Sequence, residues 1–332
     1  MAVNFMALSR VLPRRAACAS RTPAPRLVMA RGRVFRMATP QAAPSPLPGP
    51  MEPSASFGFP SKDGLALHGE LYQHPSPRGA AIVLHGYAEH CGRYREVAHV
   101  LHQAGFAALT FDMRGHGRAA GARGHALRFD EFLGDVEAAI GELDRRVPGE
   151  LPLALICHSH GGLVGLRLLA DPWRCPKRIR CAVMSSPFVR LRLKVSPVKR
   201  VSARWVGFLL PNLSLPNDIP IDKLTHDAGK LAERRVDTLC HDVAGARWFN
   251  EAQAAQAWVQ EFAHRVEVPT LWLIGGDDFI ADPSASRAVA ERVAGPAKIH
   301  VLEGQYHEVF NETARASSFD LLRAFLAENF PQ

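Results

Sequence analysis

The chain has 332 residues, of which 47% are hydrophobic, and this is enough for one large buried core or for two domains. Of its 40 basic residues, eight are arginines in the first 51 positions, where there is no Asp or Glu, and the other 32 equal the 32 acidic residues in number. The formal charge of +8 therefore belongs to the N-terminal segment, and the neutral remainder gives no indication of a nucleic-acid partner.

Residues 1–51 are rich in Arg, Ala and Pro and contain no long apolar run. This composition predicts a disordered extension outside the folded core. Two alternatives stay open: an organellar presequence, or upstream sequence included by a wrong start, with Met51 as the true first residue. A secretory signal is disfavoured because arginines interrupt every apolar candidate segment. We expect a cytoplasmic location, with membrane association, export and organellar import left open.

Residues 52–332 alternate between short apolar runs and helical patterns, which is typical of βαβ units around a mostly parallel sheet. Strands are predicted at residues 65–72, in an N-terminal hairpin, and at 80–84, 106–111, 153–156, 179–184, 270–274 and 298–302. Helices are predicted at residues 94–103, 129–145, 163–170, 284–293 and 314–329. We therefore expect one α/β domain with helices on both faces of the sheet.

The alternation breaks between about residues 188 and 264. This stretch has several prolines, no clear strand and an apolar segment at 205–215. Because it lies between two predicted core strands, it is interpreted as an inserted helical cap.

The stretch around Ser159 predicts a nucleophile. A short apolar strand ends in Cys157-His-Ser-His-Gly-Gly162, and a helical pattern follows. This nearly matches Gly-x-Ser-x-Gly, the strand-to-helix turn that exposes the serine of hydrolases above the edge of a sheet. Cys157 stands where the first glycine is expected, and its small side chain is predicted to be tolerated there.

Other polar groups also follow predicted strands, where open α/β sheets hold their ligands. Asp277 and Asp278 follow the strand at 270–274, and His307 follows the last strand. A nucleophile, an acid and a base thus occur in the order Ser, Asp, His, which is the order of an α/β-hydrolase. A serine hydroxyl needs an imidazole to take its proton, and the imidazole needs a carboxylate to orient it.

Three segments carry a resemblance to a known family. They are the His-Gly-x-x-Glu-His-x-Gly-Arg-Tyr run at 85–94, the Asp-x-x-Gly-His-Gly run at 112–117 and the Leu-Pro-Asn-Leu-Ser run at 210–214. Over about residues 55–330 the chain resembles the monoacylglycerol lipase and lysophospholipase-like branch of the α/β-hydrolase superfamily, with a serine aminopeptidase S33-type hydrolase domain. The resemblance implies an α/β-hydrolase fold whose sheet carries an inserted helical cap.

The resemblance also implies roles for individual residues. Ser159 would be the nucleophile, His307 the general base and Asp278 the acid that orients it, with Asp277 as the alternative acid. The backbone N–H groups of Tyr87 and His160 would stabilise the oxyanion. The implied reaction is hydrolysis of a carboxylic ester through an acyl-enzyme. Monoacylglycerol is the first expected substrate, and lysophospholipids or general carboxylic esters are alternatives. A non-catalytic binding protein on the same fold is a more distant alternative.

Four further residues are candidates for substrate binding. By the resemblance, Glu89 and Arg93 could bind a polar headgroup such as glycerol, or form an ion pair that holds their loop. Leu210 and Leu213 could line an acyl-chain tunnel, pack the cap onto the core, or rest on a membrane surface. The expected partner is therefore a small lipid ester, with transient membrane contact through the cap and the oligomeric state left open.

No metal or organic cofactor is expected. The six cysteines form no Cys-x-x-Cys pair, so neither a disulfide framework nor a zinc site is implied. His307-Glu308 begins like a zinc-protease helix, but Asn311 stands where the second histidine ligand would be required.

Overall fold

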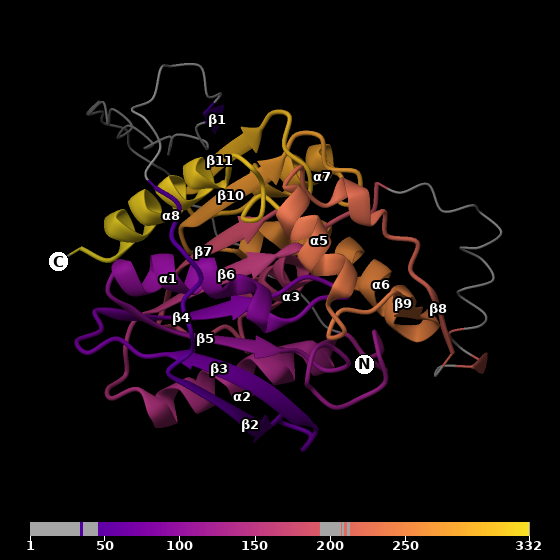
Figure 1. Ribbon diagram of the computed structural model, residues 1–332, viewed down its shortest axis with the longest axis horizontal. Helices are drawn as coiled ribbons and strands as arrows, with labels where there is room; N and C mark the ends of the chain where they lie inside the picture. The colour runs from indigo at the N-terminus through magenta and orange to yellow at the C-terminus, as the bar shows by residue number, and fades with distance from the viewer. Residues whose placement is uncertain (1–33, 36–45, 193–206, 208, 211–212, 332) are drawn as a thin grey trace, which may run out of the picture. The chain divides into compact units, whose positions relative to one another are not determined.

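A nine-stranded sheet forms the centre of the unit Gly32–Gln332 (Figure 1). The computed structural model describes residues 34–35, 46–192, 207, 209–210 and 213–331. The strand order is β1-β11-β10-β7-β6-β4-β5-β3-β2. The strands are β1 (Val34–Phe35), β2 (Ala55–Pro60), β3 (Ala66–Tyr72), β4 (Gly79–Leu84), β5 (Phe106–Asp112), β6 (Leu153–His158), β7 (Ile179–Ser185), β10 (Thr270–Gly275) and β11 (Ala297–Leu302).

In this order all neighbouring strands from β1 to β5 run parallel, whereas β3 pairs antiparallel with both β5 and β2. Each residue of β4 and of β6 is buried, as expected for strands covered on both faces. Leu84 is paired with Cys157, which is paired with Met184, so the carboxyl ends of β4, β6 and β7 meet at one edge. The prediction of a mostly parallel sheet is confirmed.

Helices cover both faces of the sheet (Figure 1). One core layer contains buried residues of α1 (Arg95–Gln103) and α8 (Arg315–Asn329). The other contains buried residues of α2 (Asp130–Arg146), α3 (Ser159–Leu169) and α7 (Pro283–Ala290). This three-layer arrangement confirms the predicted α/β-hydrolase fold.

The insertion after β7 contains helices and a second small sheet. Its described elements are β8 (Ser214–Pro216), the 3-10 helix η2 (Ile221–Lys223), α5 (Ala228–Val236), β9 (Val243–Gly245), α6 (Ala246–Phe262) and the 3-10 helix η3 (Ala263–Arg265). β8 and β9 pair antiparallel, so the prediction of a cap without strands was wrong. Each strand has only three residues and β8 ends in a proline, so neither is long enough to show an alternating pattern. Residues 205–206, 208 and 211–212 of the predicted apolar segment lie outside the described residues.

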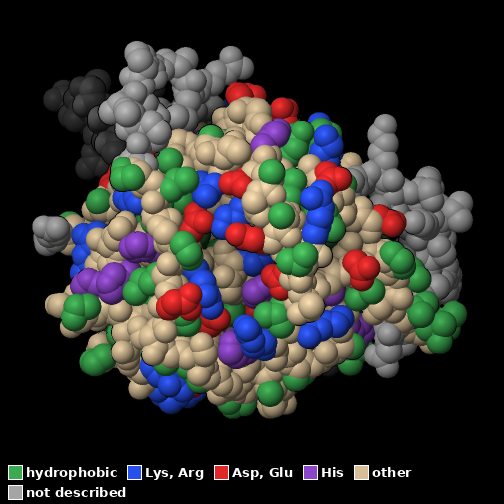
Figure 2. Space-filling model, viewed as in Figure 1, with side chains coloured by type: hydrophobic (Ala, Val, Ile, Leu, Met, Phe, Trp, Pro, Cys, Tyr) green, Lys and Arg blue, Asp and Glu red, His purple; other side chains and the backbone are tan. Residues whose placement is uncertain are grey.

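The folded chain begins before position 52. Val34–Phe35 pairs parallel with β11, the Met51 N–H donates to the carbonyl of Arg95 at 3.3 Å, and a ring nitrogen of His99 lies 2.7 Å from the carbonyl oxygen of Gly49. Residues 1–33 and 36–45 of the predicted disordered segment lie outside the described residues. Among those described, no helix is long and apolar enough to cross a membrane. Figure 2 shows Lys and Arg interleaved with Asp and Glu on the face in view.

Candidate active site

Ser159 lies at the sharp turn between β6 and α3. Its φ is +50°, a left-handed conformation that costs a non-glycine residue about 1–3 kcal/mol and is typical of functional sites. The two glycines that follow allow close approach: a Cβ at Gly161 would lie 2.4 Å from the carbonyl oxygen of Leu84, and one at Gly162 would lie 2.7 Å from Pro187 Cβ. The start of α3 therefore packs directly against the ends of β4 and β7.

Asp278 and His307 form a hydrogen-bonded pair beyond the ends of β10 and β11. His307 Nδ1 lies 2.6 Å from Asp278 Oδ2, and both residues are buried. The other carboxylate oxygen of Asp278 accepts the backbone N–H groups of Ile280 and Ala281 at 2.7 and 3.0 Å. Asp277, the alternative acid, is exposed. Because Nδ1 is occupied by Asp278, Nε2 of His307 is the nitrogen left for a serine proton.

The surroundings of His307 favour a base that is readily protonated. Burial alone would lower the pKa of His307, but the charge of Asp278 and the hydrogen bond to it outweigh burial and raise the pKa above its usual value. The neighbouring His158 differs: burial, with the positive charge of His307, lowers the pKa of His158 to about 4. Its Nδ1 lies 3.0 Å from Ser185 Oγ. His158 is thus a neutral neighbour of the pair.

The loop after β4 and the first turn of α3 bring Tyr87 and His160 to the same edge. The loop turns tightly, since Ala88 has a φ of +63° and the Gly86 N–H donates to Glu89 Oε1 at 2.5 Å. His160 is the second residue of α3, where backbone N–H groups have no acceptor within the helix. The family resemblance implies that the backbone N–H groups of these two residues bind the oxyanion, and this role stays a prediction.

Ser159 and His307 line one cavity of about 430 Å³ between the sheet edge and the cap. Its apolar wall comes from Phe188, Leu191, Ile219, Leu224, Ala244, Trp248, Phe249 and Ile280. Its polar lining comes from Gly86, Tyr87, Glu89, Arg93, His158, Asn217, Asp218, Arg234 and Glu308. An apolar wall with a few polar groups beside a reactive side chain is the usual form of a small-molecule site.

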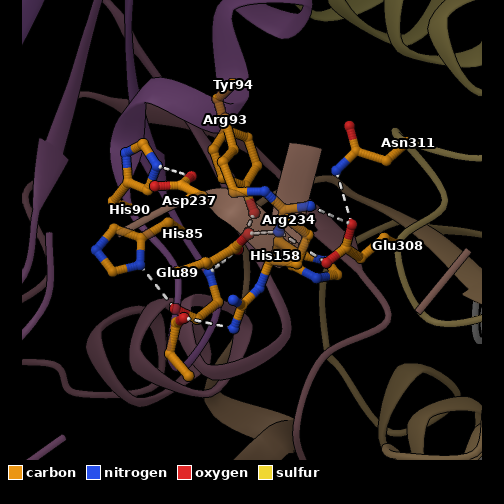
Figure 3. Close-up of polar contacts among 12 residues, drawn as sticks. His85, Glu89, His90, Arg93, Tyr94, His158, Arg234, Asp237, Glu308 and Asn311 are labelled. Carbon is orange, nitrogen blue, oxygen red and sulfur yellow. Dashed lines mark hydrogen bonds and ion pairs between the residues drawn. The ribbon is translucent and has the colours of Figure 1, made fainter. Parts of the chain in front are cut away.

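The polar end of the cavity is a buried network centred on Arg93 (Figure 3). Arg93 Nη1 and Nη2 donate to the two oxygens of Glu308 at 2.8 Å each, and Nη1 also donates to Glu89 Oε2 at 2.5 Å. The hydroxyl of Tyr94 donates to Glu89 Oε1 at 2.6 Å, and the amide of Asn311 donates to Glu308 Oε2 at 2.8 Å. Glu89 and Arg93 therefore form the ion pair that was one of the two alternatives, and both also line the cavity, while headgroup binding by them stays a prediction.

The groups of this network are charged. Burial by itself would raise the pKa of Glu89 and of Glu308, but the adjacent Arg93 outweighs it and holds the pKa of both carboxyls below the usual range. The two carboxylates in turn outweigh the burial of Arg93 and raise the pKa of its guanidinium. Arg93 thus contacts two negatively charged groups. Glu308 is a site residue that the sequence analysis considered only as part of an incomplete zinc-protease motif. Its position next to the predicted base was the available signal.

Comparison with known proteins identifies the family of the chain. The sequence pattern of the family described as serine aminopeptidase, S33, matches residues 75–314. The chain belongs to this family. It is an α/β-hydrolase and a carboxylic ester hydrolase, as predicted.

Two curated relatives of this α/β-hydrolase are 30% identical or more. Over 257 residues it is 32% identical to a monoacylglycerol lipase of Mycolicibacterium smegmatis, covering 76% of this chain and 89% of the relative. Over 254 residues it is 30% identical to the phospholipase YtpA of Bacillus subtilis, covering 75% and 95%. The crystal structure of a monoacylglycerol lipase from Paleococcus ferrophilus superposes with a TM-score of 0.72 at 28% identity, covering 79% of this chain and 99% of that one.

Leu210 and Leu213 are not among the described residues that line the α/β-hydrolase cavity, and their place in an acyl tunnel stays a prediction. They are 58% and 39% exposed, and Leu209 and Leu215 beside them are 68% and 45% exposed. The apolar wall is instead formed by residues after β7, in the later cap segments and at Ile280. The sequence could not separate a leucine that lines a cavity from one that faces outward in this irregular segment.

Two groups of described side chains place three candidate metal-ligand atoms within 4.8 Å of one another: His68, Glu70 and Cys91, and His90, Asp237 and Cys240. In the second, His90 Nδ1 accepts the Gly92 N–H at 3.2 Å, so Nε2 carries the proton and donates it to Asp237 Oδ2 at 2.7 Å. In the first, burial raises the pKa of the Cys91 thiol, which keeps it protonated. Neither arrangement favours a bound metal.

Proposed function

We propose that this α/β-hydrolase cleaves monoacylglycerols through an acyl-enzyme on Ser159. The observation that carries the proposal is the composition of the cavity that Ser159 and His307 line, which combines apolar side chains with a paired-charge network. A monoacylglycerol has the matching division, with one long apolar chain, one ester and two hydroxyl groups. The monoacylglycerol lipases among its relatives support the same substrate.

In the proposed reaction, the hydroxyl oxygen of Ser159 attacks the ester carbonyl while His307 Nε2 takes its proton. The carbonyl oxygen becomes an oxyanion that accepts hydrogen bonds from the backbone N–H groups of Tyr87 and His160. When the C–O bond to glycerol breaks, His307 returns the proton to the leaving alkoxide. Water then attacks the acyl-enzyme by the same route. This step releases the fatty acid and regenerates free Ser159.

Asp278 has a supporting role in this scheme. It accepts the Nδ1–H of His307, which fixes the tautomer with Nε2 free, and it stabilises the imidazolium that forms during attack. The two backbone N–H groups on its other oxygen hold the carboxylate in place.

The charge of the polar end favours an uncharged headgroup. Arg93 is paired with both Glu89 and Glu308, so a phosphate placed there would meet two carboxylates as well as the guanidinium. Glycerol hydroxyls can donate to the carboxylates and accept from the guanidinium without adding charge. Buried polar groups of this kind discriminate against a substrate that leaves them without a hydrogen-bond partner, because an unpaired buried group costs free energy.

A lysophospholipid is the second candidate substrate. Arg234, from α5, also lines the cavity and donates to the backbone carbonyl of Ala88 at 3.0 Å, so a second guanidinium lies near the polar end. The relative named as a phospholipase supports this candidate. Short carboxylic esters are a third candidate because the proposed chemistry does not depend on the headgroup.

Contact with a lipid surface is proposed for the exposed cap leucines. Leu209, Leu210, Leu213 and Leu215 lie close together in sequence, and each is at least 39% exposed. Apolar side chains that face water gain free energy when they enter the interfacial region of a bilayer or micelle.

The test is a substrate panel for the purified full chain: 1-oleoylglycerol, oleoyl lysophosphatidylcholine and p-nitrophenyl butyrate, with kcat/KM measured for each. The proposal predicts the highest kcat/KM for the monoacylglycerol, and loss of all three activities in Ser159→Ala. Faster cleavage of the lysophospholipid would replace the first candidate by the second. Hydrolysis that persists in Ser159→Ala would contradict the mechanism.

A further inference from the structure

Trp248, the third residue of α6, is in contact with both side chains whose backbone groups form the proposed oxyanion hole. It is 4% exposed. Its ring stacks on that of Tyr87, with centroids 3.7 Å apart and planes inclined by 21°. Its Nε1–H donates to His160 Nε2 at 3.2 Å. One cap residue therefore contacts both residues whose backbone N–H groups are the proposed donors.

The contacts of Tyr87 extend beyond Trp248. Its hydroxyl donates to the carbonyl of Gly124 at 2.7 Å and lies 3.3 Å from that of Val243 in β9. Gly124 is required for this arrangement, because a Cβ there would lie 2.2 Å from the Tyr87 hydroxyl. The side chain of Tyr87 is thus fixed on its face by the cap residue Trp248, and at its tip by Gly124 and the cap residue Val243.

The ring of His160 is fixed equally closely. It is fully buried and packs edge-to-face on Phe132, with centroids 4.7 Å apart. Since an indole N–H can only donate, Nε2 of His160 must carry the lone pair. Burial lowers the pKa of His160 to about 3, so the ring is neutral and can accept. The proposed triad uses neither His160 ring nitrogen.

We infer that Trp248 is a positioning residue that holds the oxyanion hole in register with Ser159, and thereby couples the cap to the chemistry. The inference rests on the proposed function. Backbone donors are effective only when they are held at hydrogen-bonding distance from the position that the oxyanion will occupy, and a small displacement lowers the rate sharply. Because Trp248 contacts both donor residues, a shift of α6 moves both donors together.

Two variants separate the two contacts. Trp248→Phe keeps an aromatic ring against Tyr87 but removes the hydrogen bond to His160, and Trp248→Leu removes both. Loss of one oxyanion donor typically lowers kcat by about 100- to 1,000-fold. A donor that is displaced rather than lost should cost less, so we expect kcat to fall about 10-fold in Trp248→Phe and about 100-fold in Trp248→Leu. The matched control is Trp258→Phe on the same helix, whose ring packs on the guanidinium of Arg167, 3.7 Å from its centroid. That control should retain wild-type kcat.

The deciding readout compares two inhibitors. A long-chain trifluoromethyl ketone forms a hemiketal on the serine and places an oxyanion in the hole, whereas a 1-O-alkylglycerol ether occupies the cavity without reacting. If Trp248 positions the hole, the Ki of the ketone rises in proportion to the fall in kcat, while the Ki of the ether and KM stay within about twofold. If Trp248 only lines the acyl wall, KM and the ether Ki rise and kcat is unchanged, which would overturn the inference.

The outcomes also separate this inference from the proposed function. Wild-type protein without Ser159-dependent hydrolysis would overturn both. Active wild-type protein with unchanged kcat and ketone inhibition in folded Trp248→Phe and Trp248→Leu would overturn only the role of Trp248. If Trp248→Leu does not fold, Trp248→Phe decides alone, with its circular dichroism melting curve compared with that of Trp258→Phe.

Discussion

The sulfur of Cys157 occupies the space that a side chain at Gly165 would need. A Cβ added to Gly165 would lie 2.6 Å from Cys157 Sγ and 3.4 Å from its Cβ. The cysteine stands at the first glycine position of the serine turn, and the missing side chain two turns into α3 accommodates it. Burial raises the pKa of the Cys157 thiol, so it stays protonated beside Ser159.

The contact between Cys157 and Gly165 predicts that the effect of Gly165→Ala on the free energy of unfolding changes sign when Cys157 is replaced by glycine. With Cys157 present, the added methyl group overpacks a closed core and should lower the free energy of unfolding by about 1–3 kcal/mol. In a Cys157→Gly background the same substitution should stabilise by up to about 1 kcal/mol, because alanine favours the helix over glycine. Urea unfolding of the four proteins in the cycle measures both values. Equal effects in the two backgrounds would show that the residues are independent.

Asp278→Asn should lower kcat by about 10³- to 10⁴-fold with the fold retained, because an amide cannot hold His307 in the required tautomer. The matched control is Asp277→Asn, since Asp277 is adjacent in sequence but exposed. Steady-state kinetics on p-nitrophenyl butyrate compare the two. A larger loss in Asp277→Asn than in Asp278→Asn would reassign the acid.

The raised pKa of His307 predicts the acid limb of the pH profile. The base must be neutral to accept the proton of Ser159, so kcat/KM should fall as the pH drops through a midpoint above about 6.5, the usual pKa of histidine. Glu308→Gln removes one of the negative charges that raise this pKa and should shift the midpoint to lower pH. Glu303 is an exposed glutamate that also follows β11, and Glu303→Gln should leave the midpoint of the pH profile unchanged. A midpoint that rises in Glu308→Gln would contradict this assignment.

Glu308→Gln should also alter the choice of headgroup. Without the second carboxylate, the excess negative charge around Arg93 is removed, so a phosphate there meets less repulsion and can pair with the guanidinium. We expect the ratio of kcat/KM for oleoyl lysophosphatidylcholine to that for 1-oleoylglycerol to rise about 10-fold, a change of about 1.4 kcal/mol. Glu303→Gln again serves as the control. An unchanged ratio would mean that the headgroup does not reach Arg93.

The sheet could be predicted from the sequence because its parallel strands are continuous apolar runs. The runs around β4 and β6 contain only residues that are buried, and every strand from β4 onward in the main sheet was placed within a few residues. The elements of the cap could not be placed in this way, because three-residue strands such as β8 and β9 are too short to show a hydrophobic period. The outward orientation of Leu210 and Leu213 depends on that irregular chain path.

The candidate site was foreseen where its residues follow strand ends in chain order. The hydrogen bond between His307 and Asp278 joins two such positions. Glu308 and Trp248 could not be found in this way. Glu308 acts through Arg93, 215 residues earlier in the chain, and Trp248 acts through Tyr87 and His160 from a helix whose contacts no local pattern encodes.

Labelling of Ser159 tests the central claim most directly. Full-length protein is incubated with a fluorophosphonate probe, and the adduct is located by mass spectrometry of the tryptic peptides. The account predicts one adduct, on Ser159, and no labelling of Ser159→Ala that retains the wild-type circular dichroism spectrum. Folded wild-type protein that does not react, or an adduct that persists in Ser159→Ala, would contradict it.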